Sequence, residues 1–142
     1  MKLKSVAVGA ALSLGVLAPL TIASPATSAG YTCGGHKATI VGTSGDDDLN
    51  GTNGRDVIVG LGGDDDIDGR GGNDIICGGS GDDDIDGGAG HDKIWGQTGE
   101  DDIDGEGGND FINGGAHSDD IDGGSGNTDA WTRYTYTAPA TR

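Results

Sequence analysis

A nine-residue register runs through most of this 142-residue chain and limits what it can fold into. It starts at Gly42 and reaches Asp122 without an insertion or a deletion, so that nine copies follow one another. Each copy follows the scheme G-x-x-G-x-D-x-U-x, in which U is apolar, and only His117 departs from the fourth-position glycine. A fixed short period is typical of repeat architectures, in which each unit packs mainly on its neighbours. We therefore expect a solenoid rather than a globule.

The sixth and eighth positions of the repeat are the most constant. Aspartate supplies a hard anionic oxygen suited to calcium, while glycines permit unusual backbone angles and let carbonyl groups converge on an ion. The eighth residue is the centre of a short strand and points inward, because side chains alternate across a strand. The sixth-position residues are Asp47, Asp56, Asp65, Asp74, Asp83, Asp92, Asp101, Asp110 and Asp119, and the eighth-position residues are Leu49, Ile58, Ile67, Ile76, Ile85, Ile94, Ile103, Ile112 and Ile121.

The outward positions of these strands distinguish two kinds of copy, so the true period is eighteen residues. Odd copies carry acidic residues there, as in residues 66–68, whereas even copies are mostly apolar, as in residues 75–77. One sheet is thus expected to be acidic outside and the other apolar. The apolar face either is covered by the ends of the chain or forms a partner surface. Its outward apolar residues are Val57, Val59, Ile75, Cys77, Trp95 and Phe111.

Composition adds a condition to this fold. The chain has 24 acidic residues against 8 lysines and arginines, with 31 glycines, and such a composition alone is typical of disorder. Every acidic residue lies between Asp46 and Asp129. This block attracts cations and repels nucleic acid and anionic membranes. We therefore expect neither nucleic acid nor a membrane as a partner.

The repeat resembles the RTX family of hemolysin-type calcium-binding repeats, and the resemblance covers residues 42–122. It implies an all-β fold, a parallel β-roll (a right-handed β-solenoid) with two nonapeptide repeats in each 18-residue turn. It also implies that the nine sixth-position aspartates bind Ca²⁺ between the loops of repeats n and n+2. Nine repeats contain seven such pairs, hence about seven ions. Because the inward side chains are few and the stacked aspartates repel one another, folding should depend on calcium.

The segments outside the repeat suggest export and capping. Residues 1–29 have a basic start, an apolar run and small residues, as in a secretory signal peptide, and no other segment could cross a membrane. We expect residues 30–41 to cap the first turn. Residues 123–142 start as a degenerate repeat, and we expect them to form a C-terminal cap with the aromatic residues Trp131, Tyr134 and Tyr136. The expectation is a small, secreted, extracellular protein with little besides the repeat.

The two cysteines suggest how the N-terminal segment is held. Cys33 lies in that segment and Cys77 on the apolar face, and export would place both in an oxidising compartment. A disulfide between them would pin the segment across the sheet. Two unpaired thiols or an intermolecular bond are the alternatives.

No catalytic constellation stands out from the repeat. His36, His91 and His117 lack the spacing of a zinc site and are interpreted as ordinary loop residues, although His117 replaces a loop glycine and should weaken the ninth calcium site. The carboxylates recur identically, and no nucleophile motif is present. We therefore expect no enzyme and carry over no activity from larger family members. The alternative function is an extracellular adhesion or polymer-binding module, in which the apolar face contacts a protein or polysaccharide.

Overall fold

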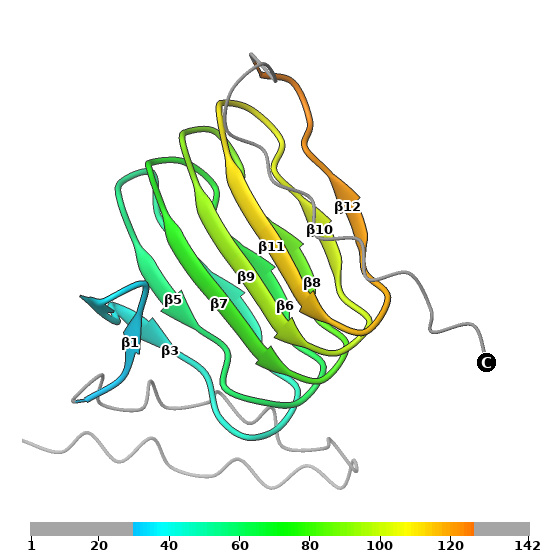
Figure 1. The fold of residues 1–142 in the computed structure, drawn as a ribbon. Helices are drawn as coiled ribbons and strands as arrows, with labels where there is room; N and C mark the ends of the chain where they lie inside the picture. The colour runs from blue at the N-terminus through cyan, green and yellow to red at the C-terminus, as the bar shows by residue number, and fades with distance from the viewer. Residues whose placement is uncertain (1–29, 127–142) are drawn as a thin grey trace, which may run out of the picture.

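The computed structural model describes residues 30–126, which form twelve strands and no helix, so the predicted all-β class is confirmed. Ten of the strands make two five-stranded parallel sheets that lie face to face (Figure 1). The acidic sheet consists, in spatial order, of β12 (Asp120–Asp122), β10 (Asp102–Asp104), β8 (Asp84–Asp86), β6 (Asp66–Asp68) and β4 (Asp48–Asn50). The apolar sheet consists of β11 (Phe111–Ala116), β9 (Lys93–Thr98), β7 (Ile75–Ser80), β5 (Val57–Val59) and β3 (Ile40–Val41).

Every strand of the two parallel sheets pairs in register with a strand eighteen residues away. Ile67 of β6 lies beside Ile85 of β8, and Ile76 of β7 lies beside Ile94 of β9. The chain alternates between the two sheets, so one turn of the solenoid contains one odd and one even repeat. This confirms the 18-residue turn of the predicted β-solenoid, which winds through about five turns.

The core is a double ladder of the eighth-position side chains between the sheets. Their outward neighbours point away because side chains alternate along each strand. The sheets contribute alternately to this ladder, and the partly buried Ile40 and Ile121 pack at its two ends. The buried members are Leu49, Ile58, Ile67, Ile76, Ile85, Ile94, Ile103 and Ile112. One apolar side chain from every repeat therefore makes a continuous but narrow core.

A small hairpin covers part of the outer face of the apolar sheet. It consists of β1 (Thr32–Cys33) and β2 (His36–Lys37), which pair antiparallel, and a disulfide joins Cys33 to Cys77 with a Cα–Cα distance of 5.9 Å. A second buried cluster forms beneath the hairpin, and Trp95 packs at its border. Its members are Cys33, Ala38, Val41, Val57, Val59, Ile75 and Cys77.

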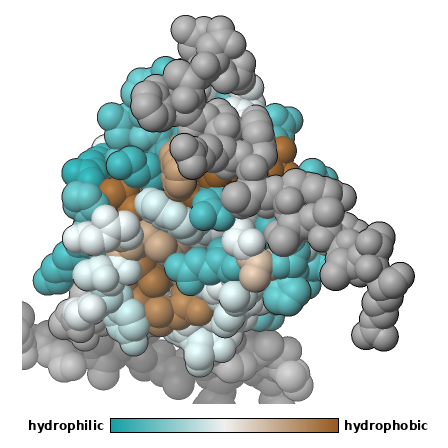
Figure 2. All heavy atoms as spheres, in the orientation of Figure 1, coloured by the Kyte–Doolittle hydropathy of each residue, from teal (hydrophilic) through white to brown (hydrophobic). Residues whose placement is uncertain are grey.

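Among the described residues, the hairpin does not cover the whole apolar face, and a cavity remains beside it. Trp95 and Phe111 are only half-buried. Seen from the side shown in Figure 1, the surface has hydrophobic residues among hydrophilic ones (Figure 2). The expected covering by the N-terminal end of the chain is thus found for part of this face. The N-terminal residues cover Val57 and Ile75, while the part around Trp95 remains accessible.

The solenoid also begins earlier than the repeat pattern indicates. Ile40 pairs with Ile58, so β3 occupies the strand position of a degenerate copy in which Ala38 stands at the aspartate position. Residues 30–41 therefore supply a strand of the sheet as well as the hairpin. Three of the even strands, β7, β9 and β11, run for six residues, because pairing continues past the turn, with Gly79 opposite Gln97.

Some sequence expectations concern residues outside the described range. The expected signal peptide, residues 1–29, and the expected cap residues Trp131, Tyr134 and Tyr136 all lie outside it. Within residues 30–126 there is no helix of a length and hydropathy that could cross a membrane.

Candidate metal sites

The sixth-position aspartates form two columns, one at each edge where the loops enter the sheets. Each aspartate comes immediately before an x-U-x strand, so the parallel register stacks aspartates eighteen residues apart. Seven of them are buried, with exposed fractions of 6% or less, namely Asp56, Asp65, Asp74, Asp83, Asp92, Asp101 and Asp110. A carboxylate is rarely buried without a partner, so these columns are candidates for binding cations.

One oxygen of each column carboxylate from Asp65 to Asp119 accepts a backbone hydrogen bond from the previous turn. The backbone N–H of Asp65 donates to Oδ1 of Asp83 at 3.0 Å, and the N–H of Asp74 donates to Oδ1 of Asp92 at 2.7 Å. The same bond joins the other successive aspartates of both columns. These bonds fix the orientation of each carboxylate through Oδ1, and its second oxygen, Oδ2, takes no part in them.

The second oxygen has no partner in most repeats. Among the described residues, seven Oδ2 atoms are buried without a hydrogen bond, those of Asp65, Asp74, Asp83, Asp92, Asp101, Asp110 and Asp119. A buried polar atom that lacks a partner destabilises the fold, and a charged one does so more. Each of these oxygens therefore requires either a proton or a cation.

The surroundings of these oxygens suit a cation such as Ca²⁺. A Cβ atom placed on Gly87 would lie 3.2 Å from Asp92 Oδ2 and 3.2 Å from the carbonyl oxygen of Gly105, two repeats further on. A Cβ atom on Gly60 would likewise meet both Asp65 Oδ2 and the carbonyl oxygen of Gly78. A carboxylate oxygen and a carbonyl oxygen thus face the same space beside seven of the nine first-position glycines, all except Gly51 and Gly114. Ca²⁺ prefers oxygen ligands of these two kinds, so the residues present fit this ion.

Burial makes these carboxyl groups hard to ionise without a cation. Desolvation by burial raises the pKa of Asp83 to about 7 and the pKa values of Asp65 and Asp92 to about 6. The hydrogen bond from the backbone of the preceding aspartate opposes this shift, and neighbouring aspartates in the column add to it. The pKa values of Asp74, Asp101 and Asp110 are raised for the same leading reason.

These pKa values predict the pH dependence of the calcium-free chain. Because the folded-state pKa lies above the ordinary value of 3.8, the fold binds protons more tightly than the unfolded chain. This contribution to stability is complete below about pH 4 and is lost as the pH rises through about 6 to 7. We expect more β structure at pH 5 than at pH 7.5 when circular dichroism is recorded after removal of calcium. The opposite order would contradict this assignment.

The structure places all nine predicted aspartates in these columns but distinguishes the first two. Oδ2 of Asp47 and Oδ2 of Asp56 accept hydrogen bonds from Thr43 and Thr52, at the second position of their own repeats. The repeat scheme treats the second position as variable, so sequence reasoning missed it. The available signal was that a β-branched residue occupies this position only in the first two copies.

A second ladder runs through the fifth position, which the sequence analysis also treated as variable. The backbone N–H of Asp82 donates to Oδ1 of Asp64 at 2.9 Å, and the N–H of Asn109 donates to Nδ1 of His91 at 2.8 Å. His91 is thus an acceptor between turns rather than an ordinary loop residue. His117 replaces a glycine and keeps the left-handed backbone of that position, with φ 89°.

Comparison with known proteins assigns the repeat to a family. The family model of the RTX calcium-binding nonapeptide repeat, which describes four copies, matches residues 41–76, 78–112 and 95–129. These ranges cover more than half of the chain. No curated protein and no solved structure matches it. The aspartate columns, the glycine loops and this match agree, and the chain belongs to the family of RTX calcium-binding nonapeptide repeats.

Proposed function

We propose that this chain is a secreted calcium-binding protein whose repeats bind several Ca²⁺ ions between successive turns and fold on binding. The seven buried Oδ2 atoms without a partner carry this proposal, because a column of such oxygens is stable only when cations or protons neutralise it. The ligands would be the Oδ2 atoms of the column aspartates and carbonyl oxygens of the glycine loops. The ions would supply positive charge that holds adjacent turns together.

The proposed sites start two repeats later than the sequence rule placed them. That rule begins with the loops of repeats one and three, whereas the Oδ2 atoms without a partner belong to repeats three to nine. Their number still suggests about seven ions. For the last of them, at Asp119, the loop two repeats further on lies outside the described residues.

An extracellular setting suits such sites. Calcium is available there at about millimolar concentration, where modest affinity suffices. The Cys33–Cys77 disulfide would also be stable in that oxidising compartment. We propose a binding role without enzymatic activity, because the carboxylates of the two columns serve the calcium sites.

Calorimetric titration of the calcium-free chain with CaCl₂ tests this function. We expect several ions to bind and the Asp83→Asn variant to bind at least one fewer, because asparagine keeps the Oδ1 acceptor but lacks the charge of the carboxylate. Asp84→Asn is the matched control, since its side chain is exposed on the outer face of β8. It should bind as many ions as the unaltered chain. A chain that binds no calcium, or equal losses in the two variants, would overturn the proposal.

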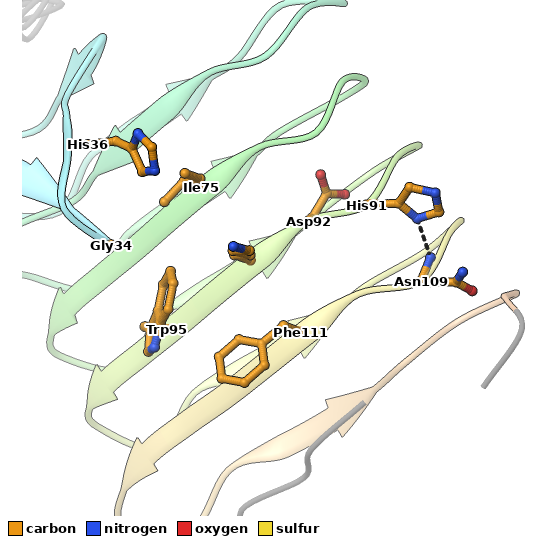
Figure 3. Close-up of a pocket in the computed structure, with 9 residues that line it drawn as sticks. Gly34, His36, Ile75, His91, Asp92, Trp95, Asn109 and Phe111 are labelled. Carbon is orange, nitrogen blue, oxygen red and sulfur yellow. Dashed lines mark hydrogen bonds between the residues drawn. The ribbon is translucent and has the colours of Figure 1, made fainter. Parts of the chain in front are cut away.

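A cavity on the apolar face supports a second candidate function, the binding of an extracellular polymer. The cavity has a volume of about 460 Å³ and lies between the hairpin and strands β7, β9 and β11 (Figure 3). Trp95 and Phe111 project side by side into it, with ring centroids 5.5 Å apart. A Cβ atom on Gly34 would lie 3.2 Å from the Trp95 ring, so the hairpin turn packs on that ring and holds it.

Basic side chains gather around this cavity, which Asp92 of an aspartate column also lines. Odd copies carry most of the acidic residues, and outside the aspartate columns Glu106 is the one acidic residue of the even copies. Lys93, His36 and His91 line the cavity, and Arg55 lies 3.5 Å from His36. Neither Arg55 nor Lys93 belongs to an ion pair within residues 30–126. Aromatic rings beside unpaired cations suit a sugar chain that carries carboxylate or sulfate groups.

Short acidic oligosaccharides test this candidate in the presence of calcium. We expect binding of an oligogalacturonate or a heparin-derived oligosaccharide, and little binding of a neutral cello-oligosaccharide. The variant Lys93→Ala should weaken binding about tenfold, equivalent to one charge-assisted hydrogen bond of about 1.4 kcal/mol. Arg70→Ala is the control, because Arg70 pairs with Asp68 away from the cavity. Equal binding of neutral and acidic oligosaccharides would contradict the role of these cations.

A further inference from the structure

The first two repeats differ from the other seven in how their aspartates are satisfied. The backbone N–H of Thr52 donates to Oδ2 of Asp56 at 2.7 Å, and its hydroxyl group donates to the same oxygen at 2.9 Å. Thr43 makes the same two bonds to Oδ2 of Asp47, at 2.5 and 2.9 Å. The other seven column aspartates each have a buried Oδ2 atom without a partner, whereas Oδ2 of Asp47 and Oδ2 of Asp56 have one. In both repeats, two donors from threonine occupy the oxygen that a cation would need.

The loops of the first two repeats also have a different backbone. In repeats three to nine the second-position residue has a positive φ, from 59° at Glu106 to 137° at Gly79, whereas Thr43 and Thr52 do not. The fourth-position glycines follow the same division, because Gly45 and Gly54 lack the positive φ that later ones have. The loop conformation therefore changes between repeats two and three.

The identity of the second-position residue explains this change. A positive φ is a genuine outlier for a β-branched residue such as threonine, because its branched side chain collides with the backbone there. None of the second-position residues in repeats three to nine is β-branched; they are Leu61, Arg70, Gly79, Gly88, Gln97, Glu106 and Gly115. With a negative φ, the threonine loop turns its own N–H and hydroxyl toward the aspartate.

The hydroxyl group completes a closed network in these loops. The backbone N–H of Gly54 donates to Oγ1 of Thr52 at 3.1 Å, and this hydroxyl in turn donates to Asp56. The corresponding N–H of Gly45 donates to Oγ1 of Thr43 at 3.3 Å. Two N–H groups and one hydroxyl group thus form a closed network around one oxygen of the aspartate within a single loop.

We propose that Thr43 and Thr52 take the place of Ca²⁺ in the first two repeats, so that calcium sites begin only at the third. This inference rests on the proposed calcium function and assigns its sites. The first turn then holds its shape without calcium, at the end of the solenoid where the Cys33–Cys77 disulfide fixes the hairpin and β3 pairs with β5. The N-terminal turn is then folded without metal, and the calcium-bound turns stack on it.

Exchanging second-position residues tests the assignment, with bound ions counted by native mass spectrometry and calorimetry. The variant Gln97→Thr should bind one ion fewer, because Gln97 is exposed and has a φ of 83° that threonine resists. The control Gln97→Asn should bind the original number, since asparagine adopts a left-handed backbone readily. The double variant Thr43→Gly, Thr52→Gly should bind one or two more ions. A Cβ on Gly42 would meet both Asp47 Oδ2 and the carbonyl oxygen of Gly60, so the oxygens for such a site are in place.

The outcomes separate this inference from the function on which it rests. If the unaltered chain binds no calcium, the proposed function itself fails. If that chain binds calcium but Gln97→Thr loses no ion, or the double threonine variant gains none, the function stands and the assignment of the threonines is overturned. The double variant replaces exposed threonines, so its ion count is informative even if Gln97→Thr folds poorly.

Discussion

Removal of calcium at pH 7.5 is expected to abolish most of the β structure between β6 and β12. Seven buried carboxylate oxygens would then lose their counter-charge. At about 1–3 kcal/mol for each unsatisfied buried group, and more for charged ones, the cost is on the order of 10 kcal/mol. The whole stability of a typical domain is about 5–15 kcal/mol, so the calcium-free turns should not persist. Circular dichroism before and after addition of EDTA measures the change.

Return of excess calcium is the control for this experiment, because the β signal should then recover fully. Reduction of the disulfide would be a separate perturbation, so Cys33 and Cys77 should remain oxidised throughout. A residual signal is expected from the hairpin and the first turn, in which threonine donors replace the ion. A spectrum that EDTA leaves unchanged would show that the columns are neutralised in some other way.

The sequence was sufficient to predict the solenoid because one physical constraint repeats in phase. A leucine or isoleucine every nine residues, with acidic or apolar neighbours in alternation, predicts strands that stack eighteen residues apart, as Ile67 and Ile85 do. The aspartate columns follow from the same register. No single repeat would have sufficed, since a short apolar segment is ambiguous between strand and helix.

What the sequence did not reveal depends on contacts outside the repeat scheme. The strand β3 was not predicted, because Ala38 stands where all nine copies have an aspartate. Only the pairing of β3 with β5 identifies this strand. The cavity beside Trp95 depends on where the hairpin crosses the sheet, which local pattern does not determine. The different loop conformation at Thr43 and Thr52 could have been predicted from the sequence, because the backbone preference of a β-branched residue is local.

The largest effect of a single substitution is expected at a fourth-position glycine in the middle of the solenoid. Gly108 has a φ of 145°, and a Cβ atom there would meet the carbonyl oxygen of Gly90 in the adjacent turn. An alanine therefore has to separate two turns whose spacing the ladder hydrogen bonds determine. We expect Gly108→Ala to destabilise the calcium-loaded fold by more than about 4 kcal/mol, a loss that only severe steric or polar defects produce. Thermal unfolding in saturating calcium, followed by circular dichroism, measures this.

The neighbouring residue provides the control for this substitution. A Cβ atom on Gly107 would lie 3.9 Å from the nearest neighbouring atom, the carbonyl oxygen of Gly88, and the φ of Gly107 is not positive. The adjacent turn already has an alanine at this position, because Ala89 forms a bridge with Gly107. Gly107→Ala should change the stability by less than about 1 kcal/mol and could raise it slightly by restricting the unfolded chain. Equal effects of the two substitutions would mean that the turns can move apart, and that calcium rather than backbone packing determines their spacing.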